Sequence, residues 1–295
     1  MNLKRPPFFR TEEKIALSFS TAVIILQFFY LYKEGFKNIT AIIVPIIAAI
    51  FFLLLIFYSA KKNSRVLEFL RTYFHIPYYG IIFTAFQTYL HKLNSNDWDW
   101  LLLKADISLI GFDITVWMEK FISKALTEIL TVSYFSYYVL PTLSVIVFYF
   151  MYKTDRQFVR KYVLAIVTGW YAAFIFYALL PAAGPDMAFP EHYKVPLQGL
   201  SPFTNYYLDV LFKYLREDSV RNTFPSMHFG ILLITNYFAY GFSKKYFFLC
   251  TLPLGILLGI ATVYLRQHYL VDLIGSLPIA VFSIYISKKF PPQRL

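Results

Sequence analysis

Two residues near the C-terminal end have the types and the spacing of a nucleophilic pair. His268 and Asp272 are four residues apart at the start of an apolar run, and in a helix residues with that spacing lie on one face, one turn apart. The carboxylate can then accept a hydrogen bond from Nδ1–H of the imidazole, which leaves Nε2 unprotonated and pointing outward. We therefore expect Nε2 of His268 to act as a nucleophile or a general base.

A second histidine, His228, follows a pattern typical of an anion-binding helix start. Pro225 suits the first turn of a helix, where its missing N–H is harmless, and Ser226 follows it directly. The hydroxyl of Ser226 and the free amides beside it would point out of that terminus. Such a terminus binds anions, phosphate in particular. His228, one residue into the helix, could protonate a leaving group there.

Arginines flank both histidines. Arg221 lies shortly before His228, and Arg266 lies two residues before His268. Guanidinium groups neutralise the charge of a phosphoryl group. Two histidines, one of them oriented by a carboxylate, together with two arginines and a helix N-terminus predict phosphoryl transfer through a phosphohistidine. We predict that Arg221, Ser226 and Arg266 bind the phosphate.

Two other interpretations of these residues stay open. His268 and Asp272 could be an ordinary helix pair, since histidines at the ends of apolar segments are common. A metal site is the second alternative, because His228, His268 and Asp272 form a set of two histidines and one carboxylate. No carboxylate cluster accompanies this set, and Arg266 beside His268 would repel a cation. We therefore expect neither a metal nor a cofactor.

The elements that must position these residues are membrane spans. The chain has 295 residues, of which 58% are apolar and 15% are charged, whereas soluble domains are roughly 45–50% apolar and about 25% charged. The net charge of +11 could indicate nucleic acid, but Lys and Arg stand as short breaks between apolar runs instead of gathering on a polar face. The composition excludes a soluble globular enzyme, a disordered chain and a DNA-binding module. An integral membrane protein without a nucleic-acid partner remains.

A helical span needs about 20 mostly apolar residues, and apolar runs without alternation indicate helices and not a barrel. We predict an all-α integral membrane protein with eight transmembrane helices, at residues 15–32, 39–60, 70–90, 128–151, 161–181, 226–243, 246–266 and 269–288. The third span is the weakest, because Arg71, His75 and Pro77 interrupt it. Arg71 lies near the end of this span, where its side chain can snorkel toward water, so we expect a structural role for it.

Two long loops, 91–127 and 182–225, are expected on the face that carries the histidines. The first loop contains three of the four tryptophans, and tryptophan prefers the headgroup level of a membrane. Segments 101–126 and 203–217 are therefore predicted to form interfacial helices.

The charged residues are distributed unevenly over the loops. The loops on the face that holds both termini carry 17 of the 28 Lys and Arg but only 4 of the 17 Asp and Glu. Cytoplasmic loops are enriched in Lys and Arg. We therefore predict cytoplasmic termini and an active site that faces the periplasm, a lumen or the exterior.

The sequence FPSMH from Phe224 to His228, followed by His268-x3-Asp272, resembles the type 2 phosphatidic acid phosphatase superfamily. The resemblance implies a six-helix catalytic core over residues 66–295, to which residues 1–65 add a two-span extension. It also implies metal-independent removal or transfer of a phosphoryl group from a lipid phosphate or phospholipid. In that family His268 would be the nucleophile, Asp272 its orienting partner and His228 the general acid.

Two features depart from the commonest pattern of that superfamily. The usual Lys-x6-Arg-Pro motif is absent, and residues 181–186 occupy its expected place. The usual arginine six residues before the last histidine is also absent, because position 262 is Thr262, and Arg266 is the nearest arginine that could replace it. These departures, and residues 106–111, resemble the branch of inositol-phosphorylceramide synthases and sphingomyelin synthases. Such relatives move a phospho-headgroup to an alcohol or lipid acceptor, in sphingolipid metabolism for example. A lipid phosphate phosphatase that releases inorganic phosphate and a non-catalytic lipid transporter or scaffold are the alternatives.

Asp186 in the second long loop has two possible roles that the sequence does not distinguish. A carboxylate near an anion site would repel phosphate, yet Asp186 could bind a headgroup hydroxyl or Arg266. The sequence leaves that choice open.

Overall fold

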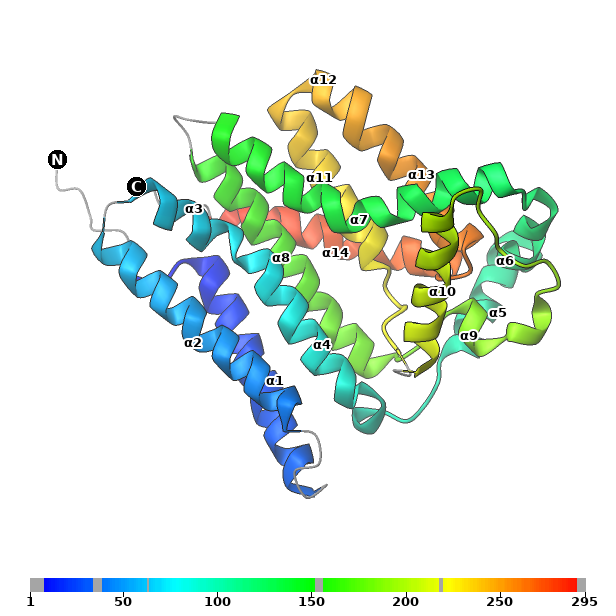
Figure 1. Ribbon diagram of the computed structural model, residues 1–295, viewed down its shortest axis with the longest axis horizontal. Coiled ribbons are helices and arrows are strands. Elements are labelled where there is room, and N and C mark those ends of the chain that lie inside the picture. Colours follow the sequence, from blue (N-terminus) through cyan, green and yellow to red (C-terminus); the bar gives the residue numbers. More distant parts are fainter. Residues whose placement is uncertain (1–7, 34–38, 63, 152–155, 218–219, 291–295) are drawn as a thin grey trace. The chain divides into compact units, whose positions relative to one another are not determined.

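The computed structural model describes residues 8–33, 39–62, 64–151, 156–217 and 220–290, and the regular structure in these ranges is entirely helical (Figure 1). The predicted all-α class is therefore confirmed for the described part of the chain. The two termini, which the charge distribution assigns to the cytoplasm, lie outside the described residues.

Six helical stretches in the described ranges are long and apolar enough to cross a membrane. They are α1 (Thr11–Lys33), α2 (Thr40–Lys61), α7 (Lys124–Met151), α8 (Arg156–Leu179), the continuous stretch Lys244–Tyr264 that ends in α13 (Leu252–Tyr264), and α14 (Leu270–Lys289). A chain with six such helices is built as a multi-pass membrane protein.

The predicted count of eight spans is not reached in the described ranges. The expected span at 226–243 forms α11 (Met227–Phe242), whose 16 residues extend only about 24 Å at 1.5 Å per residue, less than the roughly 30 Å of a hydrocarbon core. The expected span at 70–90 is divided at Phe74 into α3 (Arg65–Tyr73) and α4 (His75–Leu93). Polar residues of α3, among them Glu68, Arg71 and Thr72, lower the mean hydropathy of this segment.

The chain divides into two compact units that are each discontinuous in sequence. The first unit comprises Met1–Tyr89, Thr142–Tyr171 and Phe282–Leu295, and the second comprises Leu90–Pro141 and Ala172–Val281. The division that we expect near residue 65 is a different one and stays a prediction.

In the first unit, α1 and α2 lie side by side (Figure 1). Leu31 of α1, Ile42 of α2 and Tyr89 of α4 form a buried apolar cluster, and the rings of Tyr30 and Tyr89 stack with centroids 5.3 Å apart. The two N-terminal helices are thus held to α4 by apolar and aromatic packing.

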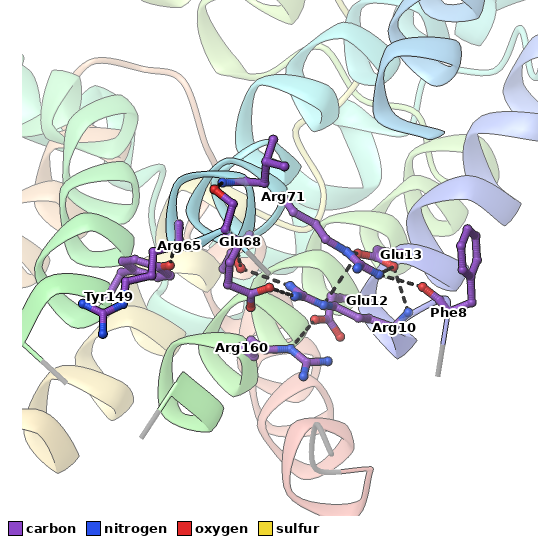
Figure 2. Close-up of polar contacts among 12 residues, drawn as sticks. Phe8, Arg10, Glu12, Glu13, Arg65, Glu68, Arg71, Tyr149 and Arg160 are labelled. Carbon is purple, nitrogen blue, oxygen red and sulfur yellow. Dashed lines mark hydrogen bonds and ion pairs between the residues drawn. The ribbon is translucent and has the colours of Figure 1, made fainter. Parts of the chain in front are cut away.

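A buried ion network joins the start of α1 to α3 and α8 within the same unit (Figure 2). Arg71 Nε lies 2.5 Å from Glu13 Oε1, and Arg160 Nε lies 3.1 Å from Glu12 Oε1. Arg10 bridges two of these elements, because it contacts Glu13 of α1 and lies 2.5 Å from Glu68 of α3. The Arg71 side chain does not snorkel to water, because a carboxylate from another helix pairs with it inside the protein.

We expect Glu13→Gln to destabilise the protein by about 3–5 kcal/mol, because it leaves the buried Arg71 guanidinium without its carboxylate. Glu13 is 0% exposed and Arg71 is 4% exposed, so water cannot replace the lost partner. Denaturant unfolding of the purified protein in detergent measures the change. Lys14→Ala removes an exposed charge one residue away and serves as the matched control. Equal stability of the two variants would contradict a structural role for the network.

The second unit holds the short helices of the two long loops. They are α5 (Asp99–Ile110), α6 (Ile114–Trp117), η1 (Met118–Phe121), α9 (Pro185–Ala188), η2 (Pro190–His192) and α10 (Pro202–Glu217). Helices therefore exist in both loops where interfacial helices are predicted. A buried cluster joins α10 to α7 and to the end of α13 through Leu208, Tyr134 and Tyr264.

Candidate functional site

The turn between α13 and α14 places His268 directly before a helix. The backbone N–H groups of Gln267 and His268 both donate to the carbonyl of Thr262, at 3.0 and 3.1 Å, so the chain folds back on the end of α13. Arg266 has φ 60°, a left-handed conformation that is uncommon for a residue other than glycine and that clusters at functional sites. This turn presents His268 at the start of α14.

His268 and Asp272 form the contact that their spacing predicts. Nδ1 of His268 lies 3.2 Å from Oδ2 of Asp272. The same oxygen accepts the backbone N–H of Tyr269 at 2.9 Å, as the third residue of a helix does in a capping box. Asp272 is 0% exposed. Since an ionised carboxylate only accepts hydrogen bonds, this contact favours the tautomer of His268 that is protonated at Nδ1, with Nε2 as an acceptor.

Burial lowers the pKa of His268 below its ordinary value of 6.5, and the neighbouring His228 lowers it further. Because the imidazole is only 4% exposed, its charged form loses hydration that the surroundings replace incompletely. His268 is consequently neutral over a wider range of acidic pH than an exposed histidine.

His228 stands on the other side of His268. Nδ1 of His228 lies 3.1 Å from Nε2 of His268, so Asp272, His268 and His228 form one hydrogen-bonded chain. Tyr134 stacks on the His228 ring with centroids 4.7 Å apart, and Tyr137 approaches it to 4.3 Å. Two tyrosines of α7 thereby fix the plane of the His228 imidazole.

Ser226 is the N-cap of α11, and its Oγ accepts from the N–H of Phe229 at 3.5 Å. Its own backbone N–H donates to the carbonyl of Asp272 at 3.0 Å, which joins the start of α11 to the first turn of α14. Pro225 precedes this cap, so the expectation that it lies in the first helical turn is wrong. Ser226 is the N-cap because its side-chain oxygen accepts a hydrogen bond from a free N–H group of the first turn, which a proline side chain cannot do.

The two arginines of the predicted phosphate site have internal partners. Arg221 pairs with Asp97, with Nε 2.6 Å from Oδ1. Arg266 is 6% exposed and donates to Glu119 at 2.8 Å, and its guanidinium lies over the ring of Tyr193 at 4.2 Å from the centroid. Their binding of phosphate stays a prediction, as does that of Ser226.

The carboxylate of Asp186 lies 3.9 Å from Nη1 of Arg266. Of the two partners left open by the sequence, the structure therefore favours Arg266. Among the described residues no group of three or more histidine, cysteine, aspartate or glutamate side chains could hold a metal ion.

Residues 181–186 connect the two histidine segments. Ala182 accepts the N–H of Thr223 at 3.1 Å, and Asp186 donates its N–H to Arg266 at 3.1 Å. Gly184 has φ 93°, and a Cβ atom there would lie 2.7 Å from the carbonyl oxygen of Gln267. Only glycine allows this close approach.

Two aspartates of α5, Asp99 and Asp106, also touch these segments, and sequence reasoning assigns neither of them a role. The signal that could have revealed them is their spacing. They are seven residues apart, and Asp106 lies in the segment predicted as an interfacial helix. A helix that includes both positions places the two carboxylates on one face.

Comparison with known proteins gives one family and one relative. Residues 101–286 match the model of the PAP2 superfamily. A PA-phosphatase related-family protein of Dictyostelium discoideum is 25% identical over 235 residues, which cover 68% of this chain and 41% of that protein. The chain therefore spans about two fifths of the length of this relative. No solved structure matches.

Proposed function

The chain belongs to the PAP2 superfamily, and on that premise we propose that it is a membrane enzyme that removes or transfers the phosphoryl group of a lipid phosphate. One observation carries the proposal: Asp272, His268 and His228 are linked in series by contacts of 3.2 and 3.1 Å. A buried carboxylate, an oriented imidazole and a second imidazole are the parts that a phosphohistidine mechanism requires.

In the first step Nε2 of His268 attacks the phosphorus atom. The new P–N bond forms as the P–O bond to the lipid breaks, and the leaving oxygen takes both bonding electrons and a proton from the imidazolium form of His228, which is left neutral. Asp272 stabilises the positive charge that develops on the His268 ring. Nδ1 of His228 lies 3.1 Å from Nε2 of His268, so the proposed attack on phosphorus requires His228 to release this contact.

In the second step His228 removes a proton from an acceptor hydroxyl. The acceptor oxygen attacks phosphorus, the P–N bond breaks, and the electron pair returns to Nε2 of His268. Water as acceptor gives inorganic phosphate, whereas an alcohol gives a new phosphate ester. No metal or cofactor takes part in either step.

We assign the phosphate oxygens to Arg221, Ser226 and Arg266. Nε of Arg266 is buried and has no hydrogen-bond partner among the described residues, so it retains a donor for a bound anion. Arg221 is more accessible, and its ion pair with Asp97 at the surface is weak enough for a phosphate to displace it.

Transfer of a phospho-headgroup between lipids is the second candidate function. It is supported by the segment from Thr262 to Tyr269, which resembles the inositol-phosphorylceramide and sphingomyelin synthases, and by the absent Lys-x6-Arg-Pro motif. The proposed orientation has cytoplasmic termini and an outward-facing site, in keeping with the excess of Lys and Arg on the termini's face.

The experiment that tests the function offers the purified protein a panel of labelled lipid phosphates and phospholipids, with and without alcohol acceptors. Release of labelled inorganic phosphate identifies a phosphatase. A labelled new lipid that appears only with the acceptor identifies a transferase. If neither product forms from any substrate of the panel, the proposal is wrong.

We expect the acid limb of kcat/KM to lie below pH 6.5, because burial and His228 lower the pKa of His268 from that value. The nucleophile must be neutral, so on this limb activity falls as pH decreases through the folded pKa of His268. A phosphate monoester itself ionises near pH 6. A phosphorothioate ester, which ionises at lower pH, separates the two effects, and an enzyme limb at or above pH 6.5 would contradict the assignment.

A further inference from the structure

We propose that Asp99 and Asp106 of α5 are positioning residues that hold the backbone on both sides of His268. The proposal rests on the function proposed above. Both carboxylates are buried, at 3% and 1% exposure, and neither contacts the histidine itself.

Asp106 binds the first turn of α14. Its Oδ2 accepts the N–H of Leu270 at 2.7 Å, and its Oδ1 accepts the N–H of Val271 at 2.8 Å. These two amides lie between His268 and Asp272. Since Asp272 accepts the N–H of Tyr269, two carboxylates together satisfy the amides that a helix N-terminus leaves free.

The stability of α14 alone does not require a cap from a distant helix such as Asp106 provides. A helix start is usually capped by a side chain of the adjacent turn, whereas Asp106 lies 164 residues before Leu270. Burying a carboxylate is costly unless several donors compensate for its lost hydration. A cap from a distant helix fixes where α14 begins relative to α5, which a local cap cannot do.

Asp99 binds the other side of the same turn. Its carboxylate accepts the N–H groups of Ala183 and Gly184 at 2.9 and 2.8 Å, and the hydroxyl of Tyr269 at 2.9 Å. Gly184 in turn lies against the carbonyl of Gln267. The residues before and after His268 are therefore both tied to α5, through Gly184 and through Tyr269.

Burial raises the pKa of both aspartates, while the hydrogen bonds that they accept from backbone N–H groups oppose the rise. The geometry of these bonds requires acceptors on both oxygens of each carboxylate. An asparagine at either position offers one acceptor and turns an N–H group toward a backbone donor, so Asp106→Asn and Asp99→Asn are sharp tests that preserve side-chain volume.

We expect each asparagine variant to lower kcat by about 10–10²-fold, the loss that a misplacement of roughly 1 Å produces, with KM changed less than about twofold. Ser108→Ala, an exposed residue of the same helix, is the matched control and keeps wild-type kcat. A loss of packing alone would lower the amount of folded protein and not kcat per folded molecule. Asparagine variants with wild-type kcat would overturn the proposal.

Hydrogen exchange gives a readout that needs no substrate. In the full-length protein, Asp106→Asn should accelerate exchange of the Leu270 and Val271 amides about tenfold or more, without changing exchange in the middle of α11. If the wild-type protein acts on no lipid phosphate, the proposed function fails, and the exchange experiment alone still decides whether Asp106 holds this turn. Unchanged exchange, with or without a fall in kcat, would contradict a positioning role.

Discussion

Replacing His268 with alanine is expected to abolish turnover, with kcat reduced by more than about 10⁴-fold. The reason is that His268 supplies the atom that bonds to phosphorus, so no other group of the site can complete the covalent step. Losses of this size are typical when a nucleophile is removed and only binding interactions remain. The measurement is steady-state turnover of the best substrate found in the lipid panel.

Two further variants make this result interpretable. His91→Ala removes an exposed histidine of the same unit and should leave turnover unchanged. Asp272→Asn keeps the shape of the side chain but alters the tautomer of His268, so a loss of up to about 10⁴-fold is expected. Wild-type function in His268→Ala would favour the non-catalytic transporter or scaffold instead.

Replacing His228 with alanine is expected to reduce kcat by about 10²–10⁴-fold on a lipid phosphate, the usual contribution of a general acid or base. The alkoxide of a lipid is a poor leaving group and needs the proton of His228. The p-nitrophenolate of p-nitrophenyl phosphate leaves without protonation, so the first step should be largely restored for that substrate. The second step still lacks its base, and the phosphorylated enzyme should accumulate.

A leaving-group series provides the control for this prediction. The defect of His228→Ala should shrink steadily as the leaving group becomes more acidic, while the defect of His268→Ala should not. A defect of equal size for all leaving groups would mean that His228 is not the general acid and acts only by packing between its tyrosines.

The helical class could be predicted because hydrophobicity over about 20 residues is a local property of the sequence. The number of spans could not, since α11 is shorter than a bilayer core and the apolar run at 70–90 is divided at Phe74. Hydropathy alone does not show where a helix breaks. The buried pairing of Arg71 with Glu13, 58 residues away, could not be predicted either, because nothing in the sequence near one residue marks the other as its partner.

The contact of His268 with Asp272 could be predicted because both residues share one helical turn. The joint pattern of the two segments predicts that His228 and His268 act at one site, whereas their direct contact at 3.1 Å joins positions 40 residues apart. The contacts of Asp99 and Asp106 join positions 84–170 residues apart, and nothing local marks such partners. Arg266 was assigned to phosphate from its charge, whereas Glu119 and Asp186 beside it come from distant loops.

The measurement that tests the account most directly is mass spectrometry of His228→Ala after brief incubation with p-nitrophenyl phosphate. Cleavage after Arg266 yields a peptide that begins at Gln267 and contains His268 as its single histidine. We predict that this peptide carries one phosphoryl group that is lost in acid, and that the double variant with His268→Ala carries none. A phosphoryl group on another residue, or hydrolysis at an undiminished rate with no protein adduct, would contradict the phosphohistidine mechanism.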